Sequence, residues 1–318
     1  MKYWTAFLLS AVFMLRTLFA AEPFDTIRML PAESVVNQTD TLFNGENAET
    51  PGFFKTTHKN VKGIAVVVHG LNVKPSKMGT PESDGTLVKL LLDSGYHVVR
   101  VTLSGHGASL QEMKNVNASQ WLSDAYIQYC KAYIEAQDAA MPLYLVGFSL
   151  GALVFESLMN ETTKTPVRFE KAVLFSPAIA IKDIARVTLA LNPLLKQSAI
   201  INSKSPVEYR AQKGASLAAY NALFELEEKL CNDKFANNTI ETVLFIDPQD
   251  EFISLRKLRE RIKEAALLQW EIVEITKDGA NIKPPYHHLI IDRNCTGETT
   301  WRSIQSKILA LFNKGKAN

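Results

Sequence analysis

The stretch Gly147-Phe148-Ser149-Leu150-Gly151 follows the pattern G-x-S-x-G and decides the fold. The apolar residues 142–146 before it predict a strand, and residues 152–158 after it predict a helix. A serine at such a turn adopts a strained backbone, and the flanking glycines leave room for the chain to double back. The pattern predicts a nucleophile elbow, which presents the Ser149 hydroxyl at the positive end of a helix. The alternative is a glycine-rich turn whose serine has no chemical role.

Strands and helices alternate on both sides of this turn. Residues 63–68 form an apolar, largely β-branched run, as expected of a central parallel strand that is buried on both faces. Further strands are predicted at residues 97–101, 143–146, 172–175, 242–246 and 271–275, with an antiparallel edge strand around residues 53–57. Helices are predicted at residues 85–94, 120–137, 150–160, 254–268 and 299–313. The sequence therefore predicts an α/β fold, with a mostly parallel central sheet and helices on both faces.

One interval breaks the alternation. Between the strands at residues 172–175 and 242–246 lie roughly sixty residues without a predicted strand, which is far more than an ordinary connection needs. Residues 183–195 are apolar and interrupted by Pro193, and residues 215–230 have the pattern of an amphipathic helix. We interpret residues 180–240 as a helical cap inserted over the top of the sheet. A simple pair of packing helices is the alternative.

Length and composition are those of an ordinary globular protein. The chain has 318 residues, of which 47% are hydrophobic and 21% charged, enough for one large α/β domain or two small ones. We expect one domain over residues 22–318. The net charge of +2 gives no electrostatic reason to expect a nucleic-acid surface.

Residues 1–21 have the layout of a secretory signal peptide. Met1-Lys2 is a short basic start, residues 3–15 are almost wholly apolar, and the small residues Ala20 and Ala21 offer a cleavage site. Arg16 at the end of the apolar region makes the fit imperfect. We expect export to a periplasm or the exterior. An uncleaved membrane anchor and a buried helix are the alternatives.

The cysteines give little information. Cys130, Cys231 and Cys295 cannot all pair within one chain, and one disulfide between Cys231 and Cys295 is possible in an oxidising compartment. Their spacing does not resemble a metal site, so no metal is expected, and burial is the default role.

A serine nucleophile needs a base to take its proton and an acid to orient that base. In a doubly wound sheet these partners follow later strands, in the order serine, acid, histidine. Asp247-Pro248-Gln249-Asp250 follows one late strand, and His287-His288 follows the last. Asp250 lies further into its loop and is the candidate acid, whereas Asp247 at the strand end is expected to be structural.

An oxyanion in acyl transfer also needs donors, usually two backbone N–H groups. One candidate is the N–H of Leu150, which directly follows the serine. The other is the N–H of Leu71 in the loop after the strand at residues 63–68, where Gly70 permits a close backbone approach. His69 is then expected to pack the turn rather than act as the base.

These motifs together resemble α/β-hydrolases of the lysophospholipase and monoacylglycerol lipase-like group. The resemblance covers about residues 60–315. Its further motifs are His69-Gly70, Gly105-His106-Gly107-Ala108-Ser109, Trp121-Leu122-Ser123-Asp124 and Ser176-Pro177-Ala178. In similar proteins an apolar residue commonly follows the catalytic histidine, and an acidic residue lies a few positions on. His288, followed by Leu289, fits the first feature, and His287 fits the second.

The resemblance implies hydrolysis of a carboxylic ester, with Ser149, His288 and Asp250 as the triad and His287 as the alternative base. It implies no cofactor. Acylglycerols or lysophospholipids are the implied substrates, and an apolar cap could bind the acyl chain and contact a membrane surface transiently. A binding protein that lost the activity, and an amidase or thioesterase with the same triad, are the alternatives. The oligomeric state stays open.

Overall fold

The computed structural model describes residues 24–39, 43, 48–107, 109–183, 196–232, 235, 239–281 and 286–315. The predicted signal peptide at residues 1–21 and most of the predicted apolar segment at residues 183–195 lie outside these ranges.

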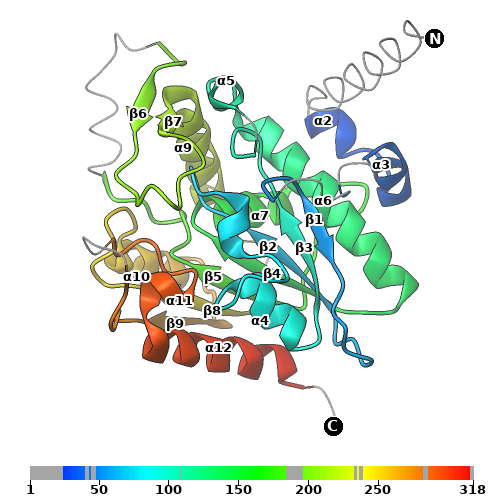
Figure 1. The fold of residues 1–318 in the computed structure, drawn as a ribbon. Coiled ribbons are helices and arrows are strands. Elements are labelled where there is room, and N and C mark those ends of the chain that lie inside the picture. The colour runs from blue at the N-terminus through cyan, green and yellow to red at the C-terminus, as the bar shows by residue number, and fades with distance from the viewer. Residues whose placement is uncertain are drawn as a thin grey trace, which may run out of the picture.

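A seven-stranded sheet forms the centre of the described part of the chain (Figure 1). The strands lie in the order β1-β3-β2-β4-β5-β8-β9, and only β1 is antiparallel to its neighbour. Their bounds are β1 Gly52–Phe54, β2 Ile64–Val68, β3 His97–Val101, β4 Leu143–Phe148, β5 Lys171–Phe175, β8 Glu241–Ile246 and β9 Trp270–Glu274. The predicted parallel sheet with one antiparallel edge strand is confirmed.

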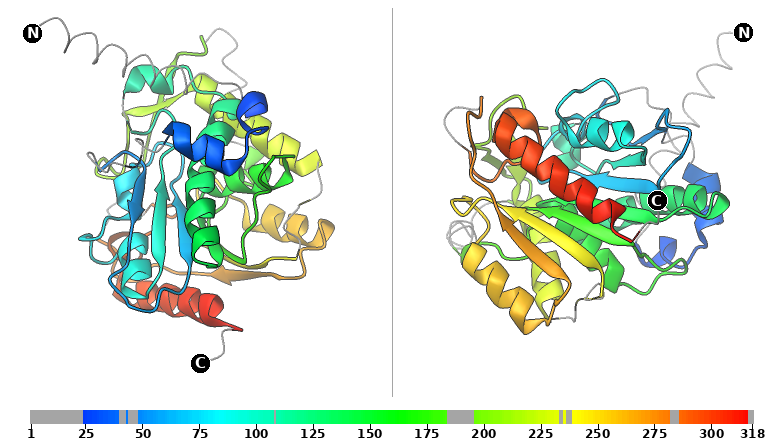
Figure 2. Two further views of the ribbon diagram at one scale, coloured as in Figure 1. Left: turned by 90° about the vertical axis from the view of Figure 1, so that its right-hand side faces the viewer. Right: turned by 90° about the horizontal axis from the view of Figure 1, so that it is seen from below.

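The strand residues alternate between two apolar layers because successive side chains point to opposite faces of a sheet. In β2, Ile64, Val66 and Val68 pack into one layer, and Ala65 and Val67 into the other. The first layer is covered mainly by α6 (Ala118–Asp138), α7 (Leu150–Asn160) and α10 (Leu255–Glu264). The second is covered by α4 (Leu87–Asp93), α11 (Arg293–Thr296) and α12 (Glu298–Asn313). Figure 2 shows α12 crossing one side of the sheet, opposite α6. The predicted helices on both faces are confirmed.

The insertion between β5 and β8 is not purely helical. Its described part holds a two-stranded antiparallel sheet, β6 (Ile200–Asn202) with β7 (Gly214–Ser216), followed by α9 (Leu217–Asn232). The helix agrees with the amphipathic pattern at residues 215–230, and it buries apolar positions against α7. The strands were missed because segments of three residues are too short to show an alternating pattern.

Shorter elements complete the fold. The helices α2 (Phe24–Ile27) and α3 (Ala32–Thr39) pack on α6, where the Phe24 ring meets the edge of Tyr126 at 6.3 Å. The 3-10 turn η2 (Pro75–Met78) and helix α5 (Leu110–Met113) lie in the loops after β2 and β3. Among the described residues, no helix is long and apolar enough to cross a membrane.

The disulfide considered between Cys231 and Cys295 is wrong. Neither cysteine forms a disulfide, and the two lie in different surroundings. Cys295 is fully buried in the layer below α12, whereas Cys231 is exposed on α9. Cys130 is also buried, and burial raises the pKa of its thiol to about 12, which keeps it protonated and unreactive. Sequence spacing could not reveal which thiols the core would enclose.

Candidate active site

Ser149 occupies the predicted sharp turn between β4 and α7. Its φ of 50° lies in the left-handed region, which is strained for a residue with a side chain. Neighbouring backbone holds the turn, since the Ser149 N–H donates to the carbonyl of Phe175 at 2.9 Å. A methyl group at Gly147 would lie 2.8 Å from Cα of Ala152, and one at Gly151 would lie 2.5 Å from the carbonyl oxygen of His69. Both glycines are therefore required for close packing, as predicted.

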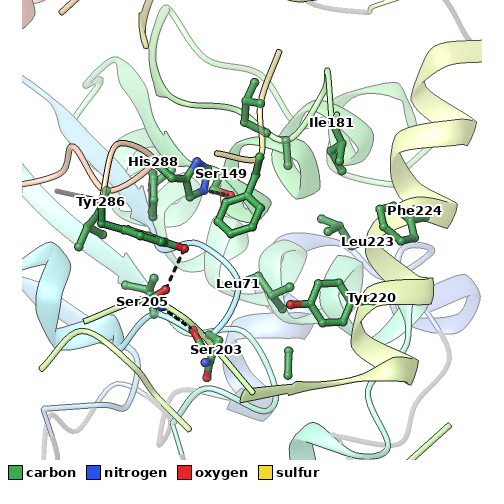
Figure 3. Close-up of a pocket in the computed structure, with 18 residues that line it drawn as sticks. Leu71, Ser149, Ile181, Ser203, Ser205, Tyr220, Leu223, Phe224, Tyr286 and His288 are labelled. Carbon is green, nitrogen blue, oxygen red and sulfur yellow. Dashed lines mark hydrogen bonds between the residues drawn. The ribbon is translucent and has the colours of Figure 1, made fainter. Parts of the chain in front are cut away.

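The structure brings Ser149, His288 and Asp250 into one chain of hydrogen bonds, of which Figure 3 shows the contact between His288 and Ser149. His288 Nε2 lies 2.9 Å from Ser149 Oγ, and His288 Nδ1 lies 2.8 Å from Asp250 Oδ2. Asp250 Oδ1 accepts the backbone N–H groups of Phe252 and Ile253 at 2.8 and 2.9 Å. The side chains of all three hydrogen-bonded residues are buried. This is the geometry that nucleophilic catalysis by a serine requires.

The electrostatics of Asp250 favour its charged form. Burial opposes ionisation, but the neighbouring His288 and the hydrogen bonds to the carboxylate outweigh it, so the pKa of Asp250 lies below its ordinary value. An ionised carboxylate at this position stabilises a positively charged His288 ring.

His287 makes a separate pair. Its Nδ1 lies 2.8 Å from Asp247 Oδ2, and Asp247 Oδ1 accepts the backbone N–H of Gln249. Among the described residues, the ring that contacts Ser149 is that of His288. The two adjacent histidines therefore have two different acids, and only the pair with Asp250 reaches the serine.

The two candidate oxyanion donors flank Ser149. Leu150 is the first residue of α7, so its N–H cannot be used within the helix. Leu71 lines the same cavity as Ser149, and the preceding Gly70 is so close that a methyl group there would lie 3.1 Å from Cβ of Ser149. Within the described part of the chain, neither N–H group has a hydrogen-bond partner.

His69 and His106 are buried below this loop and serve its backbone. The N–H of Leu103 donates to His69 Nε2, and the N–H of Asn72 donates to His106 Nε2. Each ring then carries its proton on Nδ1 and donates it to a carbonyl, that of Gly70 for His69 and that of Leu103 for His106. His69 thus packs the turn, as expected. Burial lowers the pKa of His106 to about 4 and that of His69 well below its ordinary value.

These two histidines predict an acid-sensitive fold. The unfolded chain binds protons below about pH 6.5, whereas the folded protein keeps both rings neutral down to much lower pH. The contribution of the two rings to the free energy of unfolding is therefore fully present above pH 6.5. It falls toward pH 4, by up to about 1.4 kcal/mol per pH unit for each ring. Urea unfolding at pH 7.0, 5.5 and 4.5 measures the slope. His106→Gln should reduce it and the exposed-site control His58→Gln should not; a slope unchanged by His106→Gln contradicts the assignment.

A cavity opens in front of Ser149 and His288. Figure 3 shows apolar side chains of Ile181, Leu223 and Phe224 on one side, and the hydroxyl groups of Ser203, Ser205 and Tyr286 on the other. Ser205 Oγ donates to the Tyr286 hydroxyl at 3.1 Å. The His288 ring contacts two aromatic rings, those of Phe148 and Phe252, each with its centroid 5.1 Å away.

The hydroxyl-bearing residues of the cavity and Phe252 were not predicted from the sequence. Ser203 and Ser205 belong to the insertion, where no motif marks them, and Tyr286 and Phe252 gain their position only from the packing of two loops. For Phe252 the sequence does give one signal, which is its position two residues after the candidate acid Asp250. Within the described ranges, no group of three or more histidine, cysteine, aspartate or glutamate side chains could hold a metal ion.

The strained serine turn at the edge of a parallel sheet, with a histidine and an acid in the order along the chain that the motif requires, defines an α/β-hydrolase. The profile of the family described as serine aminopeptidase, S33, matches residues 59–255, and the chain belongs to this family. No curated protein sequence matches the chain.

Solved structures share the fold at low sequence identity. A structure described as LipS and LipT, two metagenome-derived lipolytic enzymes, is 17% identical with a TM-score of 0.61, over 86% of this chain and 99% of the other. A soluble variant of monoglyceride lipase from Saccharomyces cerevisiae is 12% identical with a TM-score of 0.63, over 85% and 92%. Monoacylglycerol lipase from Paleococcus ferrophilus is 18% identical with a TM-score of 0.52, over 82% and 98%. At these identities the likeness establishes the fold.

Proposed function

We propose that the protein is a serine hydrolase of carboxylic esters. The observation that carries the proposal is the continuous hydrogen-bonded chain from Ser149 Oγ through the His288 ring to Asp250. The turn at Ser149 supports it because its strained backbone presents the hydroxyl to His288, and the lowered pKa of Asp250 supports it because a charged carboxylate stabilises a positively charged His288 ring.

The proposed reaction proceeds in two displacements. Ser149 Oγ attacks the ester carbonyl carbon while His288 Nε2 takes its proton, and Asp250 orients the ring and stabilises its positive charge. The N–H groups of Leu71 and Leu150 donate to the oxyanion. The carbon–oxygen bond to the alcohol then breaks, His288 returns the proton to the alcohol, and the acyl group stays on Ser149. Water, deprotonated by His288, attacks this ester, the bond from the acyl carbon to Ser149 Oγ breaks, His288 returns the proton to Ser149 Oγ, and the carboxylic acid leaves.

The proposed substrates are esters of a fatty acid with a polar alcohol, either monoacylglycerol or lysophospholipid. The apolar side of the cavity, with Ile181, Leu223 and Phe224, suits an acyl chain, and the hydroxyl side suits a polar alcohol. A yeast monoglyceride lipase with a bound substrate analog and Est1E from Butyrivibrio proteoclasticus with bound ferulic acid share the fold. These neighbours support an ester substrate.

Labelling with a fluorophosphonate probe tests the nucleophile. We expect labelling of the purified protein that is lost on replacing Ser149; a protein that does not label is the binding protein of the alternative hypothesis. A panel of p-nitrophenyl esters, monoacylglycerol, lysophosphatidylcholine, an amide and a thioester then separates the reaction classes. Export by residues 1–21 stays a proposal, which sequencing the N-terminus of the mature protein would test.

The acyl side of the cavity gives a prediction about chain length. Leu223 lies on α9 and lines the cavity, so Leu223→Trp should fill part of the space for the acyl chain. We expect kcat/KM for a long-chain p-nitrophenyl ester to fall about tenfold relative to that for the acetate, a size of effect typical of a few methylene groups. Glu225→Trp, at an exposed position of the same helix, is the matched control. Equal losses for both chain lengths would place the acyl chain elsewhere.

A further inference from the structure

The two histidines lie in one tight turn, residues 286–289, which we call the histidine turn. The N–H of Leu289 points to the carbonyl of Tyr286 at 3.4 Å, a long contact for a turn that holds a reacting side chain. Because His287 and His288 are adjacent, the orientation of this turn decides which ring faces Ser149. Groups outside the turn must therefore fix its orientation.

The side chain of Glu251 binds backbone N–H groups of the histidine turn. One oxygen of its carboxylate accepts the N–H of His287 at 2.8 Å, and the other accepts the N–H of His288 at 2.7 Å. Hydrogen bonds to a charged acceptor are stronger than neutral ones, and two of them from one carboxylate also fix an angle. Glu251 directly follows Asp250, so one loop binds both the backbone and the ring of His288.

The side chain of Lys277 binds backbone carbonyl groups of the same turn. Its Nζ donates to the carbonyl of Tyr286 and, at 2.6 Å, to that of Leu289, which are the first and last residues of the turn. Lys277 comes from the segment after β9, whereas Glu251 comes from the loop after β8. The carboxylate and the ammonium group therefore bind complementary backbone groups of one four-residue turn.

We propose that Glu251 and Lys277 are positioning residues that orient the histidine turn so that His288, and not His287, faces Ser149. The bond between His287 and Asp247 assists by holding the other ring away. The proposal rests on the proposed function. Neither residue lines the cavity in front of Ser149, and both act through His288.

The two residues have opposite charges, which makes the proposal testable by pH. His288 becomes positively charged when it takes the serine proton, so the Glu251 carboxylate favours that state and the Lys277 ammonium opposes it. The other titratable and charged groups that face the His288 site, from its own and the adjoining elements, are Asp247, Asp250, Tyr286 and His287, Lys182 on the backbone of Asp250, and Cys295 beside Lys277. All of these are left unchanged in the variants below.

The experiment compares Glu251→Gln with Lys277→Met. We expect kcat to fall roughly ten- to a hundredfold in both, as for a reacting group displaced by a fraction of an ångström, with KM changed less than about twofold. The acidic limb of kcat/KM should move to lower pH in Glu251→Gln and to higher pH in Lys277→Met. Lys277→Arg, which keeps two donors, should restore most of kcat. Glu260→Gln, an exposed carboxylate on α10, is the control for the charge change.

Opposite shifts of the acidic limb of kcat/KM in the two variants support the positioning roles. Acidic limbs that stay in place, or that move in the same direction, overturn those roles. If Glu251→Gln does not fold, Glu251→Asp replaces it: the shorter carboxylate keeps its charge, so kcat should fall while the limb stays. Fluorophosphonate labelling separates the two proposals. Wild-type protein that fails to label overturns the proposed function itself, whereas variants that label as fast as wild type overturn only the positioning roles.

Discussion

Ser149→Ala should lower kcat for ester hydrolysis by about 10⁴-fold or more, because it removes the atom that forms the acyl-enzyme. The remaining rate would come from the oxyanion donors and binding alone. KM should change little, since the cavity walls stay in place, and the folded protein should survive because alanine is smaller than serine. Initial rates with a p-nitrophenyl ester measure the loss, and fluorophosphonate labelling should disappear with it.

Ser176→Ala is the matched control. Ser176 follows the neighbouring strand β5, is fully buried, and has a φ of 40°, so it shares the strained backbone of Ser149. Its hydroxyl has no hydrogen-bond partner in the described part of the chain. We expect its kcat to stay within about twofold of wild type. A Ser149→Ala variant that retains a tenth of the activity would mean that another residue attacks the ester.

The features that could be predicted from sequence are those set by local pattern. The β-branched run of β2 and the glycines around Ser149 specify a buried strand and a sharp turn regardless of distant contacts. The hydroxyl side of the cavity could not be predicted, because Ser205 and Tyr286 are 81 residues apart and meet only through folding of the insertion. The same holds for the buried position of Cys295.

The choice between His287 and His288 shows the limit of local pattern most clearly. The two residues are identical and adjacent, and their neighbours in the sequence favour His288 by one feature and His287 by another. What separates them is the partner each finds, Asp247 or Asp250, and the orientation of the turn that carries both. Those partners belong to a loop about forty residues earlier in the chain, and a sequence pattern carries no information on how two loops meet.

His288→Ala should therefore lower kcat by about 10⁴- to 10⁶-fold, whereas His287→Ala should lower it less than about tenfold. His288 Nε2 is the atom 2.9 Å from Ser149 Oγ, so its loss removes the base for both displacements. His287 contributes one contact with Asp247, whose loss loosens the histidine turn without removing a reacting group. Stopped-flow and steady-state rates of ester hydrolysis at several pH values measure both variants.

The double variant Ser149→Ala with His288→Ala sharpens this test. Groups that act as one unit are not additive, so the double variant should be about as slow as Ser149→Ala alone. The double variant with His287→Ala should be equally slow whichever ring is the base, because no nucleophile remains in it. If His287 were the base, the single variant His287→Ala would already be inactive. A His287→Ala enzyme that keeps most of its kcat excludes this, because a chain that has lost its base cannot deprotonate Ser149.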